Sequence, residues 1–150
     1  MRQGLDAWKA AGALTNQPYF LALLAEAYGR SEQVEEGLLA LEEALAVAQK
    51  NGERWYEAEI HRLKGSLLLK PTDQDLSQVE SCFRQAMEVA RSQEAKWLEL
   101  RAATSLGRLW QGQGKNEEAR QLLPTIYCWF TEGFDTADLK EAKALTEEIS

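Results

Sequence analysis

The sequence has few of the residues that build catalytic and metal sites. Its 150 residues include one histidine and two cysteines. Cys82 and Cys128 lack the close spacing of a zinc site or a disulfide framework, and both occur in apolar helical patterns, so we expect free, reduced core thiols. His61 would need a nucleophile and an orienting group beside it, and a buried packing role fits its pattern better. We therefore expect a protein that is not an enzyme and has no catalytic residues, no metal and no cofactor.

Long apolar runs and an excess of positive charge are also missing. A membrane span needs about 20 consecutive apolar residues, and no stretch approaches this. Acidic residues number 24 against 17 basic ones, a net charge of −7, which disfavours nucleic acid and anionic lipid as partners. Met1-Arg2-Gln3-Gly4 leads into an amphipathic segment and not a signal peptide, so we expect a cytoplasmic protein.

Apolar residues recur at helical spacing almost throughout, whereas strand alternation and hairpin signals are missing. Asn51-Gly52 and Pro71 mark helix ends, and Pro124 predicts a kink or restart. The sequence therefore predicts one all-α domain, residues 1–150. The expected helices are Leu5–Ala13, Pro18–Arg30, Val34–Lys50, Arg54–Lys70, Leu76–Gln93, Ala95–Gln111, Glu117–Phe130 and Thr136–Ile149.

A pattern of residues, called the cassette below, recurs at a spacing of 42 residues. Trp55-x-Glu57 returns as Trp97-x-Glu99, and the small residue Gly65 returns as Gly107. A fixed period of this length indicates stacked helical repeats, in which each repeat packs only on its neighbours. The other matching positions are Ala44/Ala86, Val47/Val89, Ala48/Ala90 and Leu68/Trp110.

The small and large positions of the cassette resemble the tetratricopeptide repeat. The residues that carry the resemblance are Ala25, Tyr28, Gly37, Leu41 and Ala44, then Gly65, Leu68, Val79, Phe83 and Ala86, then Gly107, Trp110, Ala119, Leu123 and Ile126. The family period is about 34, so the chain departs from it by a longer passage between hairpins. The resemblance implies antiparallel helix hairpins stacked as a right-handed superhelix. Its expected parts are the second helix of a truncated repeat (1–14), three repeats (18–51, 54–93 and 95–130) and a capping helix (135–150).

The segment from Trp129 to Ala142 resembles the C-terminal end of large bacterial signalling proteins, namely ATPase-linked nucleotide cyclases and maltose-activator-type transcription regulators. In tetratricopeptide domains the first helices line a groove that binds a peptide or a neighbouring domain. The resemblance therefore implies a non-catalytic interaction scaffold, a regulatory or sensor fragment of a larger protein. The implied groove residues are Tyr19, Ala22, Glu26, Arg30, Glu59, Arg62, Ser66, Lys70, Arg101, Thr104, Arg108 and Gln111.

Two alternatives stay open for these surfaces. Five of the groove's charged residues are basic and two are acidic, which predicts a basic groove for an acidic peptide; a plain solvated helix face fits the same pattern. The chain could instead form homodimers through an open N-terminal apolar face that includes Leu5 and Trp8. The tryptophans are expected to pack, with Trp129 seating the last helix.

Overall fold

The computed structural model describes residues 17–52, 54–71, 75–130 and 136–149. These residues form seven α-helices and no strand, so the described chain is all-α as expected. The predicted helix at Leu5–Ala13, and with it Leu5 and Trp8, lies outside the described residues. The helices are α2 (Gln17–Arg30), α3 (Val34–Asn51), α4 (Glu57–Leu68), α5 (Leu76–Ser92), α6 (Lys96–Gly112), α7 (Asn116–Tyr127) and α8 (Ala137–Glu148).

Local signals account for several helix ends. The side chain of Asp75 accepts hydrogen bonds from the backbone N–H groups of Ser77 and Gln78 and so caps the start of α5. Gly52 follows α3 with a φ of 74°, a left-handed conformation that suits glycine. Of the kink or restart that the sequence predicted at Pro124, the restart does not occur, because α7 continues through this proline and ends at Tyr127.

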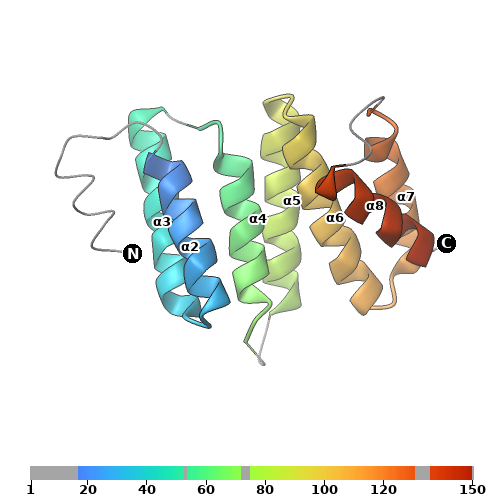
Figure 1. Cartoon of the computed structure of the whole chain (residues 1–150), viewed down its shortest axis with the longest axis horizontal. Coiled ribbons are helices and arrows are strands. Elements are labelled where there is room, and N and C mark those ends of the chain that lie inside the picture. Colours follow the sequence, from blue (N-terminus) through green and yellow to red (C-terminus); the bar gives the residue numbers. More distant parts are fainter. Residues whose placement is uncertain (1–16, 53, 72–74, 131–135, 150) are drawn as a thin grey trace.

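Two rows of helices make up the described structure (Figure 1). In Figure 1, α2, α4, α6 and α8 form the nearer row, and α3, α5 and α7 lie behind them. Each helix packs closely on the next one along the chain from α2 to α8. The helices of the nearer row also contact one another, α2 with α4, α4 with α6 and α6 with α8. Side chains that project from this row therefore share one face of the molecule.

Glycines let the helix pairs approach closely where the cassette places them. A Cβ at Gly65 would lie 2.7 Å from Phe83 Cε1, and Phe83 is only 1% exposed. At the equivalent position, a Cβ at Gly107 would lie 3.1 Å from Leu145 Cδ2 and 3.3 Å from Leu123 Cδ1. The small residues thus face large ones across the helix interfaces, in keeping with close-packed interiors.

The last helix packs on the end of the array through an apolar stripe. Leu139, Ala142 and Leu145 of α8 are fully buried, and they join the same core as residues of α6 and α7. The expected seating role of Trp129 was wrong: this side chain is 65% exposed, and its ring lies 4.1 Å from the Lys96 ammonium group. The apolar stripe of α8 therefore holds the helix in place.

The other tryptophans of the described ranges, Trp55, Trp97 and Trp110, divide into two groups. Trp110 is 7% exposed and its indole N–H donates to Glu80 Oε1 at 2.6 Å. Trp55 and Trp97 are 52% and 42% exposed near the starts of α4 and α6. Both pack as expected, but on aromatic neighbours at the surface and not in the core: Trp55 on Tyr19 and Tyr56, and Trp97 on Phe130. Within the described ranges, no helix combines the length and the apolar character needed to cross a membrane.

Candidate functional site

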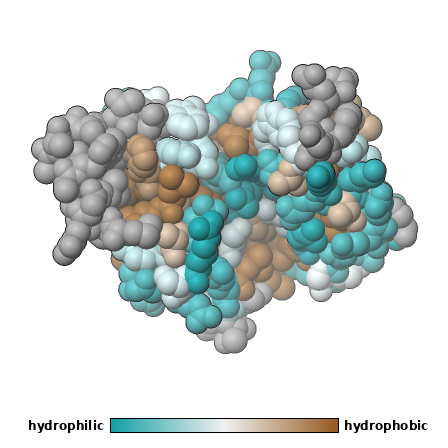
Figure 2. Space-filling view, viewed as in Figure 1, coloured by the Kyte–Doolittle hydropathy of each residue, from teal (hydrophilic) through white to brown (hydrophobic). Residues whose placement is uncertain are grey.

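A pocket with a volume of about 400 Å³ lies on the face formed by α2, α4, α6 and α8. Every helix of the nearer row contributes to it. Figure 2 shows apolar surface gathered over the α2–α4 part of this face and hydrophilic surface over α8. The pocket is lined by Ala22, Leu23, Glu26, Tyr56, Glu59, Arg62, Leu63, Arg101, Thr104, Ser105, Asp138 and Glu141.

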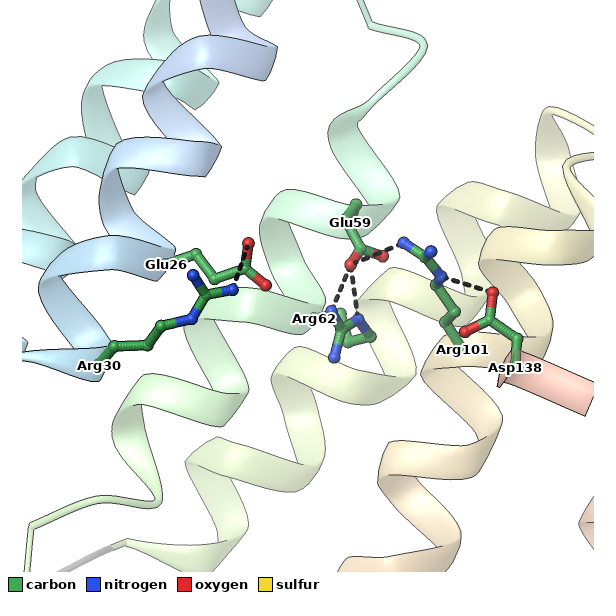
Figure 3. Close-up of polar contacts among 6 residues, drawn as sticks. All are labelled: Glu26, Arg30, Glu59, Arg62, Arg101 and Asp138. Carbon is green, nitrogen blue, oxygen red and sulfur yellow. Dashed lines mark hydrogen bonds and ion pairs between the residues drawn. The ribbon is translucent and has the colours of Figure 1, made fainter. Parts of the chain in front are cut away.

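Glu59 of α4 is the most deeply buried charged group of the pocket, with 2% of its surface exposed. Its Oε1 accepts from Arg62 Nε at 2.9 Å, from Arg62 Nη2, and from Arg101 Nη1 at 3.4 Å. Its Oε2 is buried and has no hydrogen-bond partner. Figure 3 shows both arginines on the same oxygen. Because unsatisfied buried polar atoms are costly, this oxygen needs an explanation.

Arg101 joins α4, α6 and α8 through its guanidinium group. Besides Glu59, it binds Asp138 Oδ2 through Nε at 2.9 Å (Figure 3). Burial acts to lower the pKa of Arg101, but the hydrogen bond with Asp138 and the charge of Glu59 outweigh it, and the pKa lies above its usual value. The group therefore stays charged at every relevant pH and fixes the start of α8 beside the pocket.

Aromatic rings border the pocket at the start of α4. Tyr56 lines it, and the Tyr56 ring lies 5.0 Å from that of Tyr19 in an edge-to-face contact. Tyr19 also stacks on the exposed ring of Trp55, with centroids 5.8 Å apart. Burial, followed by the charge of Glu59, raises the pKa of Tyr56 to about 12. The phenol is therefore neutral, and its surroundings disfavour added negative charge.

The expectation of a basic groove was wrong. The lining contains four carboxylates and two guanidinium groups, a net charge of −2. Two of the carboxylates, Asp138 and Glu141, come from α8, which the repeat register did not include. Glu141 also accepts from Arg108 Nε at 2.9 Å, so that arginine is paired. Glu26 is likewise paired, loosely, with Arg30, so two of the four carboxylates have an arginine partner outside the lining. The pocket is therefore not basic, and it offers an acidic ligand no excess of positive charge.

The predicted groove residues divide into those that line the pocket and those that do not. The pocket includes Ala22, Glu26, Glu59, Arg62, Arg101 and Thr104, whereas Tyr19, Arg30, Ser66, Lys70, Arg108 and Gln111 are outside its lining. Thr104 is buried and its hydroxyl donates to the Leu100 carbonyl at 2.8 Å, so this group serves the helix.

The predicted residues outside the lining have other neighbours. Arg30 pairs loosely with Glu26 at 3.7 Å, and Lys70 borders a separate hollow beside Pro71. Sequence reasoning missed Leu23, Tyr56, Leu63, Ser105, Asp138 and Glu141 of the lining. Asp138 and Glu141 are separate acidic positions of α8, and nothing in the sequence indicated which helix face they would meet.

The remaining candidate residues stand apart from the pocket. His61 is half-buried, and burial lowers its pKa. Cys82 is half-buried, but the expected core position of Cys128 was wrong, since this residue is exposed just after α7. Among the described residues, no group of three or more His, Cys, Asp or Glu side chains is arranged to hold a metal ion.

Comparison with known proteins adds one relative. No protein-family model matches the chain. The sequence is similar to an uncharacterized protein of Rhizobium meliloti (strain 1021), with 28% identity over 108 residues, or 72% of this chain. The match covers only 10% of that protein's length. The chain thus resembles a small part of a much longer bacterial protein.

Proposed function

We propose that the chain is a tetratricopeptide-like, non-catalytic interaction domain that binds a peptide or a neighbouring domain across α2, α4, α6 and α8. It would be a regulatory or sensor part of a larger cytoplasmic bacterial signalling protein, with another protein segment as its partner and neither nucleic acid nor membrane. The helices would continue as a right-handed superhelix, and binding in the groove would transmit or gate the activity of the parent's other domains.

The observation that carries this proposal is the pocket itself. Its lining comes from the four helices of one row, at positions distributed from Ala22 to Glu141. A surface built from several stacked helices offers an extended chain successive contacts, which suits repeat proteins as binders. The long relative supports the idea of a part within a larger protein, since it matches over a tenth of its length.

A steric block of the pocket tests the proposal. Ser105 of α6 is half-buried in the lining, and Ser105→Phe would fill the pocket without changing its charge. Ser81→Phe is the matched control, because Ser81 is exposed on α5 outside the lining. Peptides selected against the domain from a displayed random library should bind the Ser81→Phe variant and lose affinity for Ser105→Phe. Equal binding to both variants, with both folded by circular dichroism, would reject the groove.

Self-association is the second candidate. Phe20 and Leu23 are 41% and 38% exposed on α2, and Figure 2 shows apolar surface over the α2–α4 part of the molecule. Exposed apolar groups of this kind favour association between copies. Light scattering from low micromolar to near-millimolar protein should show a growing mass for the wild type and less for Phe20→Ser. A constant monomer mass would exclude this alternative.

A further inference from the structure

The unpartnered oxygen of Glu59 defines what kind of group can enter the pocket. A carboxylate is acceptor-only when ionised, so Glu59 Oε2 can be satisfied only by a hydrogen-bond donor. The carboxylate of an acidic peptide brings only acceptors, which cannot satisfy Oε2, and it would stand beside the buried charge of Glu59. The pocket therefore selects a donor, and a positively charged one above a neutral one.

The geometry of Glu59 also distinguishes between the two common cationic side chains. An arginine guanidinium binds best as a fork to both oxygens of a carboxylate. Oε1 of Glu59 is already occupied by Arg62 and Arg101, and only Oε2 remains. A lysine ammonium group is a compact point charge that needs only one strong acceptor.

The rest of the lining suits a lysine side chain as well. Leu23 and Leu63 give the pocket an apolar wall, against which the methylene stem of a lysine can be buried. The Tyr56 ring adds an aromatic surface that attracts cations. Glu26 and Glu141 are further carboxylates of the lining.

We propose that the pocket binds a lysine side chain of the partner segment, with its ammonium group donating to Glu59 Oε2. This inference rests on the proposed function, because it names the chemistry of the segment that the groove would hold. It assigns to Glu59 the role of the recognition residue and to Arg62 and Arg101 the role of fixing its orientation.

Capped heptapeptides that are identical except for the central residue test the inference directly. The central residue would be lysine, arginine, acetyl-lysine or glutamate, and binding would be followed by amide NMR at low salt. The lysine peptide should shift the amide signals of Tyr56, Glu59 and Arg101. The acetyl-lysine and glutamate peptides should bind at least about tenfold more weakly, because they lack a charged donor. Equal binding of lysine and acetyl-lysine, or of lysine and arginine, would overturn the inference.

Variants of the chain separate recognition from folding. Glu59→Gln should weaken the lysine peptide by at least about tenfold, since it replaces the charged acceptor. Glu26→Gln changes a 40% exposed side chain at the same pocket, and should weaken binding about two- to fivefold without threatening the fold. Glu88→Gln makes the same change on the exposed surface of α5 and should have no effect. Unchanged affinity in the Glu26 and Glu59 variants would contradict the assignment.

The two proposals fail in different ways. If the glutamate peptide binds in preference to the lysine peptide, and Ser105→Phe abolishes that binding, the lysine inference is wrong and the groove function stands. If Ser105→Phe leaves peptide binding intact, the groove itself is wrong. If none of the peptides shifts the signals of the pocket residues up to millimolar concentration, the lysine site does not exist.

Discussion

The contact between Gly65 and Phe83 gives the sharpest prediction for stability. Gly65→Ala would place a methyl carbon 2.7 Å and 2.9 Å from two ring carbons of Phe83, and 3.2 Å from Cys82 Cβ. Carbon atoms are in good contact at about 3.5–4.0 Å, so the ring or the helices must shift. Phe83 is 1% exposed and belongs to the apolar core, so its ring is enclosed by neighbouring side chains.

The expected loss follows from two opposing terms. Overpacking a core costs about 1–3 kcal/mol. Replacing glycine by alanine inside a helix returns about 0.5–1 kcal/mol. We therefore expect Gly65→Ala to lower the free energy of unfolding by about 0–2.5 kcal/mol, with a central value of about 1 kcal/mol. Urea denaturation followed by far-ultraviolet circular dichroism would measure it, provided the transition is two-state.

A matched glycine provides the control. A Cβ at Gly112, the last residue of α6, would meet nothing within 4 Å, so Gly112→Ala should be neutral or slightly stabilising. The clash itself is tested by a double-mutant cycle with Phe83→Leu, because a smaller side chain should accept the new methyl group. The cost of Gly65→Ala should then fall, with a coupling of about 0.5 kcal/mol or more. A Gly65→Ala protein as stable as Gly112→Ala would refute the packing argument.

Three further predictions concern other parts of the chain. The hydrogen bond from Trp110 is the largest cause of the lowered pKa of Glu80, so its stabilisation is present above the unfolded pKa of Glu80 and is lost as the pH falls through the folded one. Trp110→Phe should therefore cost about 1 kcal/mol more in urea titrations at neutral pH than in acid, where the loss of packing at this buried position remains. A cost that does not change with pH would contradict this. Leu145→Ala should lower the free energy of unfolding by about 2–5 kcal/mol, because the Leu145 side chain is fully buried. Amide hydrogen exchange of α8 should also become faster. Unchanged protection of these amides would show that other contacts hold α8. Cys128 is exposed, whereas Cys82 is half-buried and burial raises its pKa. Timed alkylation with mass spectrometry should therefore modify Cys128 first. The opposite order would be evidence against the α7 end as described.

The sequence alone was sufficient to predict the helices and the residues that pack between neighbouring helices. Apolar periodicity located all seven described helices, and Gly52 marks a helix end that the structure confirms. The pairing of small and large residues at Gly65 and Phe83 was visible because it recurs along the chain. Such features are local or repeat at a fixed distance, so a single sequence contains them.

The electrostatic character of the pocket depends on a contact that does not repeat. Asp138 and Glu141 reach the pocket only because α8 packs on α6, at the point where the cassette ends. Periodicity says nothing about the direction in which such a helix lies. The predicted basic groove was wrong for that reason, although Glu59, Arg62 and Arg101 were correctly expected to share one face.

Positions that are 42 residues apart separate structural from recognition roles. Glu57 and Glu99 are the same residue type, are both 4% exposed, and each pairs with a basic residue three positions earlier, so each serves its own helix start. Glu59 and Arg101 occupy equally equivalent positions but carry opposite charges, and they bind each other across α4 and α6.

The identical pair Glu57 and Glu99 therefore has a structural role at the helix starts. The unlike pair Glu59 and Arg101 gives the pocket its own arrangement of charges. Exchanging the two charges, with Glu59→Arg and Arg101→Glu together, would keep the pair but place a second guanidinium group beside Arg62 and a second carboxylate beside Asp138. We expect the exchanged protein to be less stable than the wild type in urea denaturation. Equal stability would mean that the ion pair between positions 59 and 101 does not depend on the charges of Arg62 and Asp138 beside it.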